Sequence, residues 1–274
     1  MYGLNYAMGS GDPEFARLTM QAGLVADFTQ RLFRAAGLAP GMRVLDVGSG
    51  MGDTALVAAG IVGPAGRVVG IDRDPAVVAK ANERVRGLDR VRFVTGTIEE
   101  YAEAQPFDAV VGRFVLFHQA DPATAIRHAA ALVRPGGVVA FAELDYSAWS
   151  VDRDCCFPHV EICHQHRAWL LAALGRAGVH LDMGLRMRQD FRRAGLPGSQ
   201  VVCETMAAGG ADMALLTLGV ETLRTLAPVL EQHGIATRDE IGFDTLEQRM
   251  RDGVAHADSQ ILGPRCFGAW ATAT

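Results

Sequence analysis

The chain has 274 residues with a formal net charge of −5, 49% hydrophobic residues and 21% charged residues. This is the composition of an ordinary globular protein long enough for a substantial core, and it contains no block of Lys or Arg to form the basic face that nucleic acids require. The five cysteines show no C-x-x-C spacing, no apolar run approaches the ~18 residues of a membrane span, and the first residues lack a secretory pattern. We therefore expect a cytoplasmic protein that binds neither nucleic acid nor a membrane.

The first expected element is a helix that begins at Asp12-Pro13-Glu14. An acid at the N-cap followed by proline at the first helical position is typical of a helix start. Apolar residues then recur near one face to about Ala36.

Strand and helix patterns alternate over the next hundred residues. Short β-rich runs separated by helical stretches predict parallel β-α-β units with right-handed crossovers. We expect strands near 42–47, 67–72, 91–95, 107–112 and 137–143, and helices near 52–62, 74–86 and 121–132.

After Asp145 the pattern becomes mainly helical. We expect helices at 155–178, 184–194, 211–233 and 237–256, and strands at 199–206 and 266–271. About fifty residues therefore separate the last two strands, and an ordered helical lid is a better interpretation of them than an irregular loop. The predicted organisation is an N-terminal cap helix at 1–38, a cofactor-binding core at 39–148, and cap elements with the last two strands at 149–274.

The most informative segment is a glycine-rich turn after the first strand. Gly48, Gly50 and Gly52 follow Asp46, and the second strand closes on Asp72. An acid at the end of the second strand is suited to bind the hydroxyls of a ribose. A pyrophosphate would be repelled by the neighbouring Asp46, by several kcal/mol in a partly dry site, whereas a cationic nucleoside would be attracted. The charge pattern thus favours S-adenosylmethionine over NAD.

At these residues the chain resembles the class I S-adenosylmethionine-dependent methyltransferases, in the small-molecule branch that contains the ubiquinone and menaquinone methyltransferases. Four motifs of that family are matched in order, over roughly residues 15–145: 45–52, 69–72, 107–113 and 132–138. The resemblance implies a Rossmann-like α/β fold with a seven-stranded, mostly parallel sheet, helices on both of its faces and a helical cap. It also implies S-adenosylmethionine as the cofactor.

The resemblance also implies residues for the cofactor and for the acceptor. The cofactor residues are Gln21, Asp46, Gly48, Ser49, Gly50, Asp72, Arg73, Gly96, Thr97, Ile98 and Arg113. The third-strand acid that many relatives use for the adenine amino group is replaced by Thr97. The expected substrate residues are Phe114, Phe117, His118, Asp145, Tyr146 and Trp149. His118 is the candidate general base, because the pKa of an ordinary histidine lies near neutrality; hydrogen bonding near Asp121 is the alternative role.

The predicted reaction is methylation at O or C of a small, hydrophobic or aromatic metabolite, with natural-product biosynthesis as a candidate setting. No metal is expected, because the histidines and cysteines of residues 155–178 close no ligand set, and a monomer or homodimer is expected. Three alternatives stay open. The first is a cyclase or other enzyme that retains the sulfonium cofactor without methyl transfer, the second is a non-enzymatic cofactor-sensing module, and the third is an NAD dehydrogenase.

Overall fold

The computed structural model describes residues 12–151, 156–209 and 213–273. The chain divides into two compact units. We call the first the sheet unit; it comprises Val25–Glu143, Met183–Cys203 and Phe267–Thr274. We call the second the helical unit; it comprises Met1–Leu24, Leu144–Asp182 and Glu204–Cys266.

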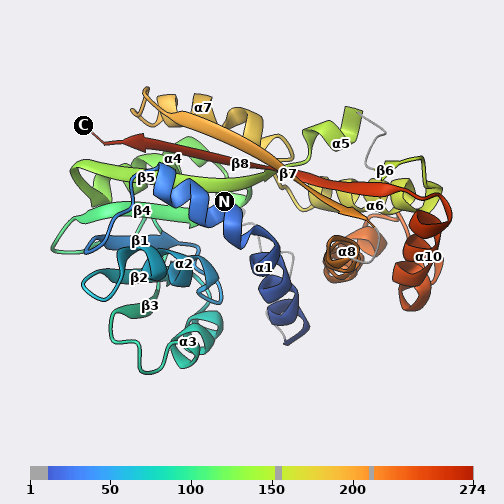
Figure 1. Cartoon of the computed structure of the whole chain (residues 1–274), viewed down its shortest axis with the longest axis horizontal. Coiled ribbons are helices and arrows are strands. Elements are labelled where there is room, and N and C mark those ends of the chain that lie inside the picture. The colour runs from blue at the N-terminus through green and yellow to red at the C-terminus, as the bar shows by residue number, and fades with distance from the viewer. Residues whose placement is uncertain (1–11, 152–155, 210–212, 274) are drawn as a thin grey trace. The chain divides into compact units, whose positions relative to one another are not determined.

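The sheet unit is built on five parallel strands that lie side by side in Figure 1, in the order β3-β2-β1-β4-β5. Their bounds are β1 (Arg43–Val47), β2 (Arg67–Asp72), β3 (Val91–Thr95), β4 (Phe107–Arg113) and β5 (Val133–Asp145). Leu45 in the centre of β1 is in register with Val69 on one side and Val110 on the other. All three side chains are buried, as expected for a parallel sheet that is covered on both faces.

Three further strands complete the sheet. They are β6 (Cys156–Phe157), β7 (Gln200–Gly209) and β8 (Gln260–Thr272). β8 follows β5 in the sheet and pairs with β7, and β6 pairs with β8 in antiparallel fashion. Gly136 and Gly137, near the start of β5, exchange backbone hydrogen bonds with Ala273 just after β8, so these two strands run in opposite directions. The mostly parallel Rossmann-like fold is confirmed.

Helices pack on the strands of the sheet unit. α2 (Asp53–Val62) contacts β1 and β2, and α3 (Pro75–Arg84) contacts β2 and β3. α4 (Pro122–Leu132) contacts β4 and also packs against α7 (Met183–Arg193). α1 (Asp12–Ala35) begins in the helical unit and ends in the sheet unit.

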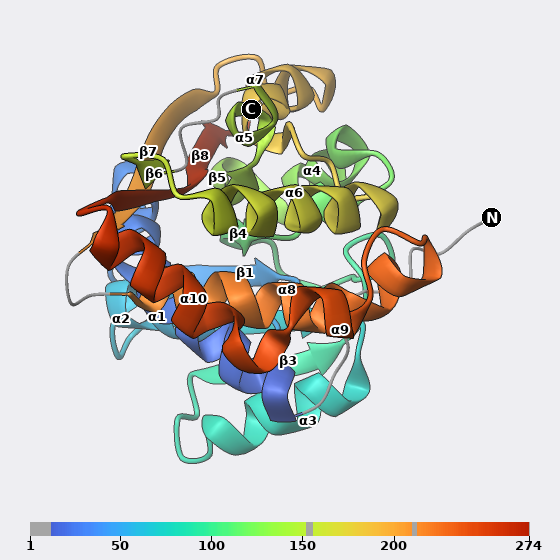
Figure 2. The same ribbon diagram turned by 90° about the vertical axis from the view of Figure 1, so that its right-hand side faces the viewer.

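The helical unit is centred on α6 (Glu161–Arg176), which packs against α8 (Ala214–Gln232) and α10 (Phe243–His256), as Figure 2 shows. Short helices α5 (Ser147–Val151) and α9 (Arg238–Ile241) complete it. None of the helices in the described ranges combines the length and apolar character needed to cross a membrane.

Several predicted boundaries were wrong. The helix expected at 237–256 is two helices, because Gly242 adopts a φ of +64° and ends α9. The helix expected at 155–178 begins at Glu161, after the short strand β6. Residue 155 lies outside the described residues, as do residues 211–212 of the helix expected at 211–233. Strands β5 and β8 also begin earlier than predicted.

Candidate active site

The glycine-rich turn leaves β1 at the carboxyl edge of the sheet and leads into α2. Gly48, Gly50 and Gly52 all have a positive φ, between +50° and +87°. A Cβ on Gly48 would lie 2.7 Å from Cγ2 of Val115, and one on Gly52 would overlap the Phe93 ring. A Cβ on Gly50 would meet nothing within 4 Å. Two of these glycines are thus required by packing within the protein, whereas Gly50 borders open space that a ligand can approach.

Asp46 is a fully buried carboxylate directly before this turn. Neither of its oxygens has a hydrogen-bond partner among the described residues. Burial raises its pKa to about 8, opposed mainly by the Arg113 guanidinium and further by the backbone amide of Ala55. An unpartnered buried acid is costly unless a cation or a donor reaches it. The ammonium and sulfonium charges of S-adenosylmethionine fit this requirement.

Ser49 lies in the glycine turn, three residues after Asp46. Its backbone N–H donates to the carbonyl of Ile71 across 2.9 Å, which ties the turn to β2. Its hydroxyl is buried and has no hydrogen-bond partner in the described part of the chain. The turn therefore holds a second polar group that a ligand or water can satisfy.

Asp72 ends β2 beside the turn. One carboxylate oxygen accepts the N–H of Gly50 at 2.9 Å, and the other accepts the N–H of Asp74 at 3.0 Å. The resemblance predicts this carboxylate as the ribose ligand, and the structure shows that it also fixes the conformation of the glycine turn. Because each carboxylate oxygen has two lone pairs, acceptor capacity for two hydroxyls remains.

The residues expected near the adenine follow β3. Gly96 donates its N–H to the carbonyl of Asp72 across 2.9 Å, which places this segment next to the proposed ribose acid. Ile98 is buried and Arg73 is exposed. The Thr97 hydroxyl lies 3.4 Å from a carboxylate oxygen of Glu100, to which it donates.

The segment after β4 holds three of the expected substrate residues. Phe114 has a φ of +59°, a strained conformation for an aromatic residue. Phe117 is buried, and its ring centroid lies 4.1 Å from that of His118. Arg113 at the end of β4 donates to the Thr29 hydroxyl across 3.1 Å.

Glu143 holds this segment in place, and the sequence did not single it out for that role. Its buried carboxylate accepts backbone N–H groups from Val115, Leu116 and Phe117 at 3.0, 2.7 and 3.3 Å. Burial raises its pKa to about 8 despite these bonds. The one available signal was an acid inside an otherwise apolar strand, Phe141-Ala142-Glu143-Leu144, which is unusual unless the acid has partners.

The remaining predicted residues, Gln21, Asp145, Tyr146 and Trp149, belong to the helical unit. The Gln21 amide oxygen lies 3.4 Å from Nη1 of Arg17. Asp145 is buried and accepts the N–H of Ser147 at 3.1 Å. Tyr146 is buried, which raises the pKa of its hydroxyl, and its ring meets Trp149 edge-on at 5.5 Å.

The sheet order and the glycine turn define a Rossmann-like α/β protein, and the unpartnered acid at the carboxyl edge of its sheet suits a cationic ligand. A family model described as a methyltransferase domain matches residues 38–174, which is half of the chain. The chain therefore belongs to the class I S-adenosylmethionine-dependent methyltransferase family, which confirms the resemblance seen in the sequence.

Individual relatives agree with this assignment. The chain is 33% identical over 148 residues to a ubiquinone biosynthesis O-methyltransferase of Sodalis glossinidius, covering 53% of this chain and 50% of that protein. It spans about half the length of the curated relatives it matches.

Solved structures share the fold. A putative methyltransferase from Bacillus halodurans superposes with a TM-score of 0.57 at 15% identity, covering 89% of this chain and 97% of that one. The [4+2]-cyclase SpnF superposes with a TM-score of 0.52 at 20% identity, covering 89% and 80%.

Proposed function

We propose that this protein transfers the methyl group of S-adenosylmethionine to an oxygen or carbon atom of a small, hydrophobic or aromatic metabolite. The observation that carries the proposal is the buried Asp46 carboxylate, which has no partner among the described residues and lies on β1 just before the turn whose Gly50 borders open space. A cationic ligand without phosphates satisfies that carboxylate, whereas a pyrophosphate would be repelled by it.

The cofactor supplies a methyl group already activated by a sulfonium leaving group. The protein therefore has to bind the cofactor, orient the acceptor and exclude water. Asp46 balances the positive charge, and Asp72 accepts the ribose hydroxyls. The methionine part is assigned to Gln21, Gly48, Ser49, Gly50 and Arg113, and the adenine to Arg73, Gly96, Thr97 and Ile98.

On the family resemblance, the residues assigned to the acceptor are Phe114, Phe117, His118, Asp145, Tyr146 and Trp149. His118 is the candidate general base for an acceptor that must lose a proton. Its ring is half-buried and packs against Phe117 with the ring planes tilted by 33°, so its orientation is restrained by packing.

The helical unit contains a small internal cavity with a mostly apolar lining. Its volume is about 50 Å³. Apolar side chains dominate its lining, beside the buried His166: Trp149, Leu215, Leu216, Met250, Ile261 and Leu262. The cavity is several-fold smaller than the ~300 Å³ or more of a small-molecule site, so it does not define the acceptor. The three helices between β7 and β8 that build much of this unit are consistent with a specialised substrate, as in natural-product biosynthesis.

A turnover screen with isotopically methyl-labelled S-adenosylmethionine tests the proposal. We expect at least one phenolic, enolic or quinonoid compound to gain one methylene unit by mass spectrometry, with one S-adenosylhomocysteine formed per product. Conversion without S-adenosylhomocysteine would instead indicate a cyclase that keeps the cofactor intact. Stabilisation by NAD but not by S-adenosylmethionine in a thermal-shift assay would overturn the assignment.

The ribose assignment has its own test. Asp72→Ala should weaken S-adenosylmethionine binding by at least ten-fold, because it removes the hydroxyl acceptor and frees the turn at Gly50. Asp74→Ala is the matched control. It removes the N-cap acceptor for the Ala76 N–H and should lower stability by about 1 kcal/mol while leaving cofactor affinity unchanged.

A further inference from the structure

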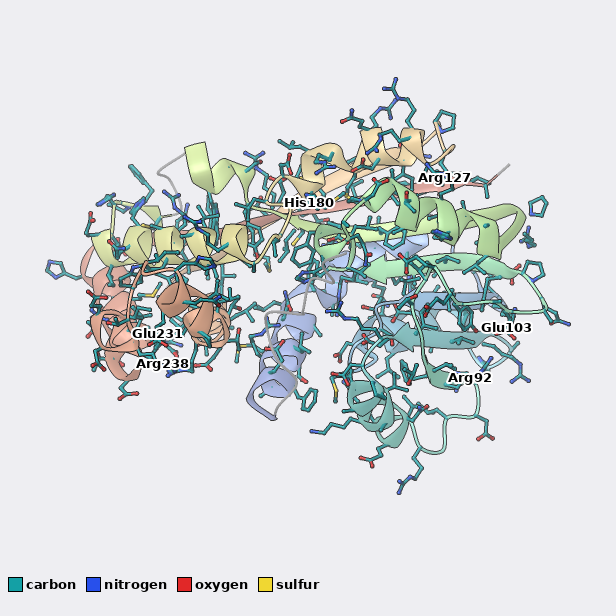
Figure 3. All side chains as sticks on the ribbon, turned by 180° about the vertical axis from the view of Figure 1, so that it is seen from behind. Arg92, Glu103, Arg127, His180, Glu231 and Arg238 are labelled. Carbon is teal, nitrogen blue, oxygen red and sulfur yellow. The ribbon has the colours of Figure 1, made fainter. Side chains whose placement is uncertain are left out.

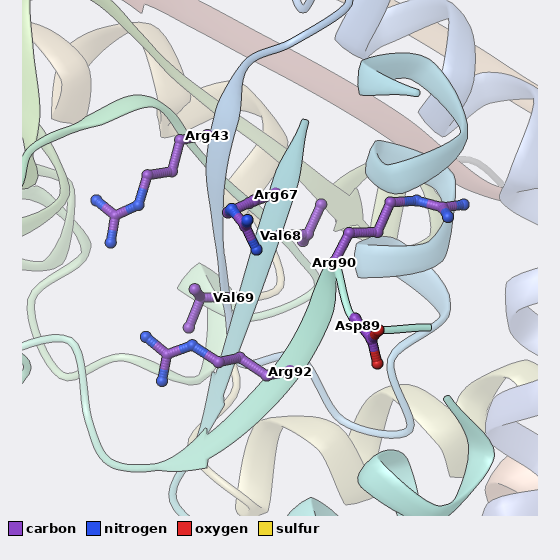
Figure 4. Close-up of a pocket in the computed structure, with 7 residues that line it drawn as sticks. All are labelled: Arg43, Arg67, Val68, Val69, Asp89, Arg90 and Arg92. Atoms are coloured by element: carbon purple, nitrogen blue, oxygen red, sulfur yellow. The ribbon is translucent and has the colours of Figure 1, made fainter. Parts of the chain in front are cut away.

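Arginine side chains from three neighbouring strands line a hollow at the amino edge of the sheet unit (Figure 4). Its volume is about 100 Å³, roughly three times the ~30 Å³ that a water molecule occupies in the liquid. The lining consists of Arg43, Arg67, Val68, Val69, Asp89, Arg90 and Arg92. β1 begins here and ends at the glycine turn, so the hollow and the candidate active site lie at opposite edges of the sheet.

Strand register brings three of these arginines to one face. Arg43 is in register with Arg67, and Val69 is in register with Arg92. In a parallel sheet, partners in register and alternate residues along a strand project to the same side. Figure 4 agrees, since Arg43 and Arg92 extend to the same side of the sheet near Val69, whereas Arg90 extends away from them.

Glu103 fixes the positions of two of the three guanidinium groups. Its carboxylate lies 3.1 Å from Nη2 of Arg43 and 3.1 Å from Nη2 of Arg92; Arg92 and Glu103 are labelled in Figure 3. The Tyr101 hydroxyl donates to the same carboxylate and is the main cause of its lowered pKa. The Arg43 guanidinium also lies over the Phe107 ring at 4.2 Å. The single negative charge of Glu103 is therefore shared by the guanidinium groups of Arg43 and Arg92, whose positions are restrained.

The third arginine, Arg67, has no ion-pair or hydrogen-bond partner for its side chain within the described ranges. Asp89, the one carboxylate of the lining, forms no ion pair with the arginines among the residues that the structure describes. The hollow thus carries more positive than negative charge, although the whole chain carries −5. Guanidinium groups offer paired donors that match the oxygens of an oxyanion.

We propose that this hollow binds a phosphate group, either as free inorganic phosphate or as the phosphate of a small metabolite. Arg67 is the main donor, and Arg92 and Arg43 add charge from positions that Glu103 fixes. The size of the hollow suits a compact tetrahedral anion. The inference does not depend on methyl transfer, because no residue of the candidate active site takes part in it.

Isothermal titration calorimetry in a chloride buffer of fixed ionic strength tests the proposal, with inorganic phosphate and methyl phosphate as separate probes. We expect saturable binding to the unmodified protein and at least ten-fold weaker binding to Arg67→Gln. The substitution should leave the folded structure unaffected, because the Arg67 side chain has no partner in the described part of the chain. The melting temperature measured without phosphate checks this. Arg86→Gln is the matched control, because Arg86 is also exposed and unpaired among the described residues.

The two probes distinguish the sources of the phosphate. Binding of inorganic phosphate alone indicates the free ion, and binding of methyl phosphate with similar affinity indicates a phosphorylated metabolite; either supports the site. Absence of binding by both probes, or equal affinity in the unmodified protein and both variants, would overturn it.

Discussion

Leu116 donates its backbone N–H to the buried carboxylate of Glu143 across 2.7 Å. The neighbouring Val115 and Phe117 donate to the same carboxylate. The Glu143 carboxylate thus supplies the acceptor for three backbone N–H groups of the segment after β4, and in this way it positions Phe117 and His118. Its side chain is fully buried. Glu143 is accordingly a positioning residue of the candidate active site.

Two substitutions of Glu143 test its role as the acceptor for these backbone N–H groups. Glu143→Leu leaves three backbone N–H groups without their acceptor and should lower the free energy of unfolding by roughly 3 kcal/mol or more, at ~1–3 kcal/mol for each unsatisfied group. Glu143→Gln retains one acceptor oxygen and should lower it by only about 1 kcal/mol. Chemical denaturation measures both values. Equal stability of the two variants would contradict the role of the carboxylate.

The same group makes stability depend on pH. The pKa of Glu143 rises from 4.5 to about 8 on folding, so the folded state holds the proton more tightly than the unfolded chain. The stabilising effect is complete below pH 4.5 and is lost as the pH rises towards 8. We expect the unfolding free energy of the ligand-free protein to fall across this window, and Glu143→Gln to reduce the slope. An identical slope in the variant would show that Glu143 ionises normally.

Asp46 should couple cofactor binding to pH. Its pKa in the ligand-free protein is about 8, and the charged groups that act on it are Arg113, Asp72 and Asp53. Because a bound cation favours the ionised carboxylate, the pKa of Asp46 must fall on binding, so below pH 8 Asp46 releases a proton when the cofactor binds. Affinity should therefore increase by up to about ten-fold per pH unit as the pH approaches 8, then level off.

Calorimetry in two buffers of different ionisation enthalpy measures this proton release. Asp46→Asn is the control, since it keeps the size of the side chain but cannot ionise. It should bind S-adenosylmethionine more weakly at pH 8 and show no proton release. A constant dissociation constant from pH 6 to 8 in the unmodified protein would exclude ionisation of Asp46 as the cause of cofactor binding.

The glycine turn gives a fourth prediction, because Gly48 and Gly50 face different surroundings. Gly50→Ala places its methyl group in open space and should lower stability by about 1–2 kcal/mol for the positive φ alone. Gly48→Ala adds a clash with Val115 and should lower it further. If Gly50 borders the cofactor, Gly50→Ala should weaken binding at least ten-fold in a protein that still folds. Unchanged affinity would move the cofactor away from this glycine.

Local patterns were sufficient to predict the glycine turn, because Asp46 and Gly48 to Gly52 belong to one short strand-turn segment. Five parallel strands were predicted for the same reason. The role of Glu143 was not predictable, since its partners lie 26 to 28 residues earlier in the chain. The arginine hollow likewise required the register that places Arg43 beside Arg67. The break at Gly242 was missed because the apolar period continues through it.

His118 provides the last prediction, on the chemistry itself. Its ring packs on Phe117 in the segment that Glu143 fixes, so replacement by alanine should leave cofactor affinity unchanged. If His118 removes a proton from the acceptor, His118→Ala should reduce kcat by about 100-fold or more and abolish the acid limb of the pH–rate profile. A reduction below ten-fold with the acid limb retained would make His118 a packing partner of Phe117, and the acceptor would then have to be nucleophilic without a protein base.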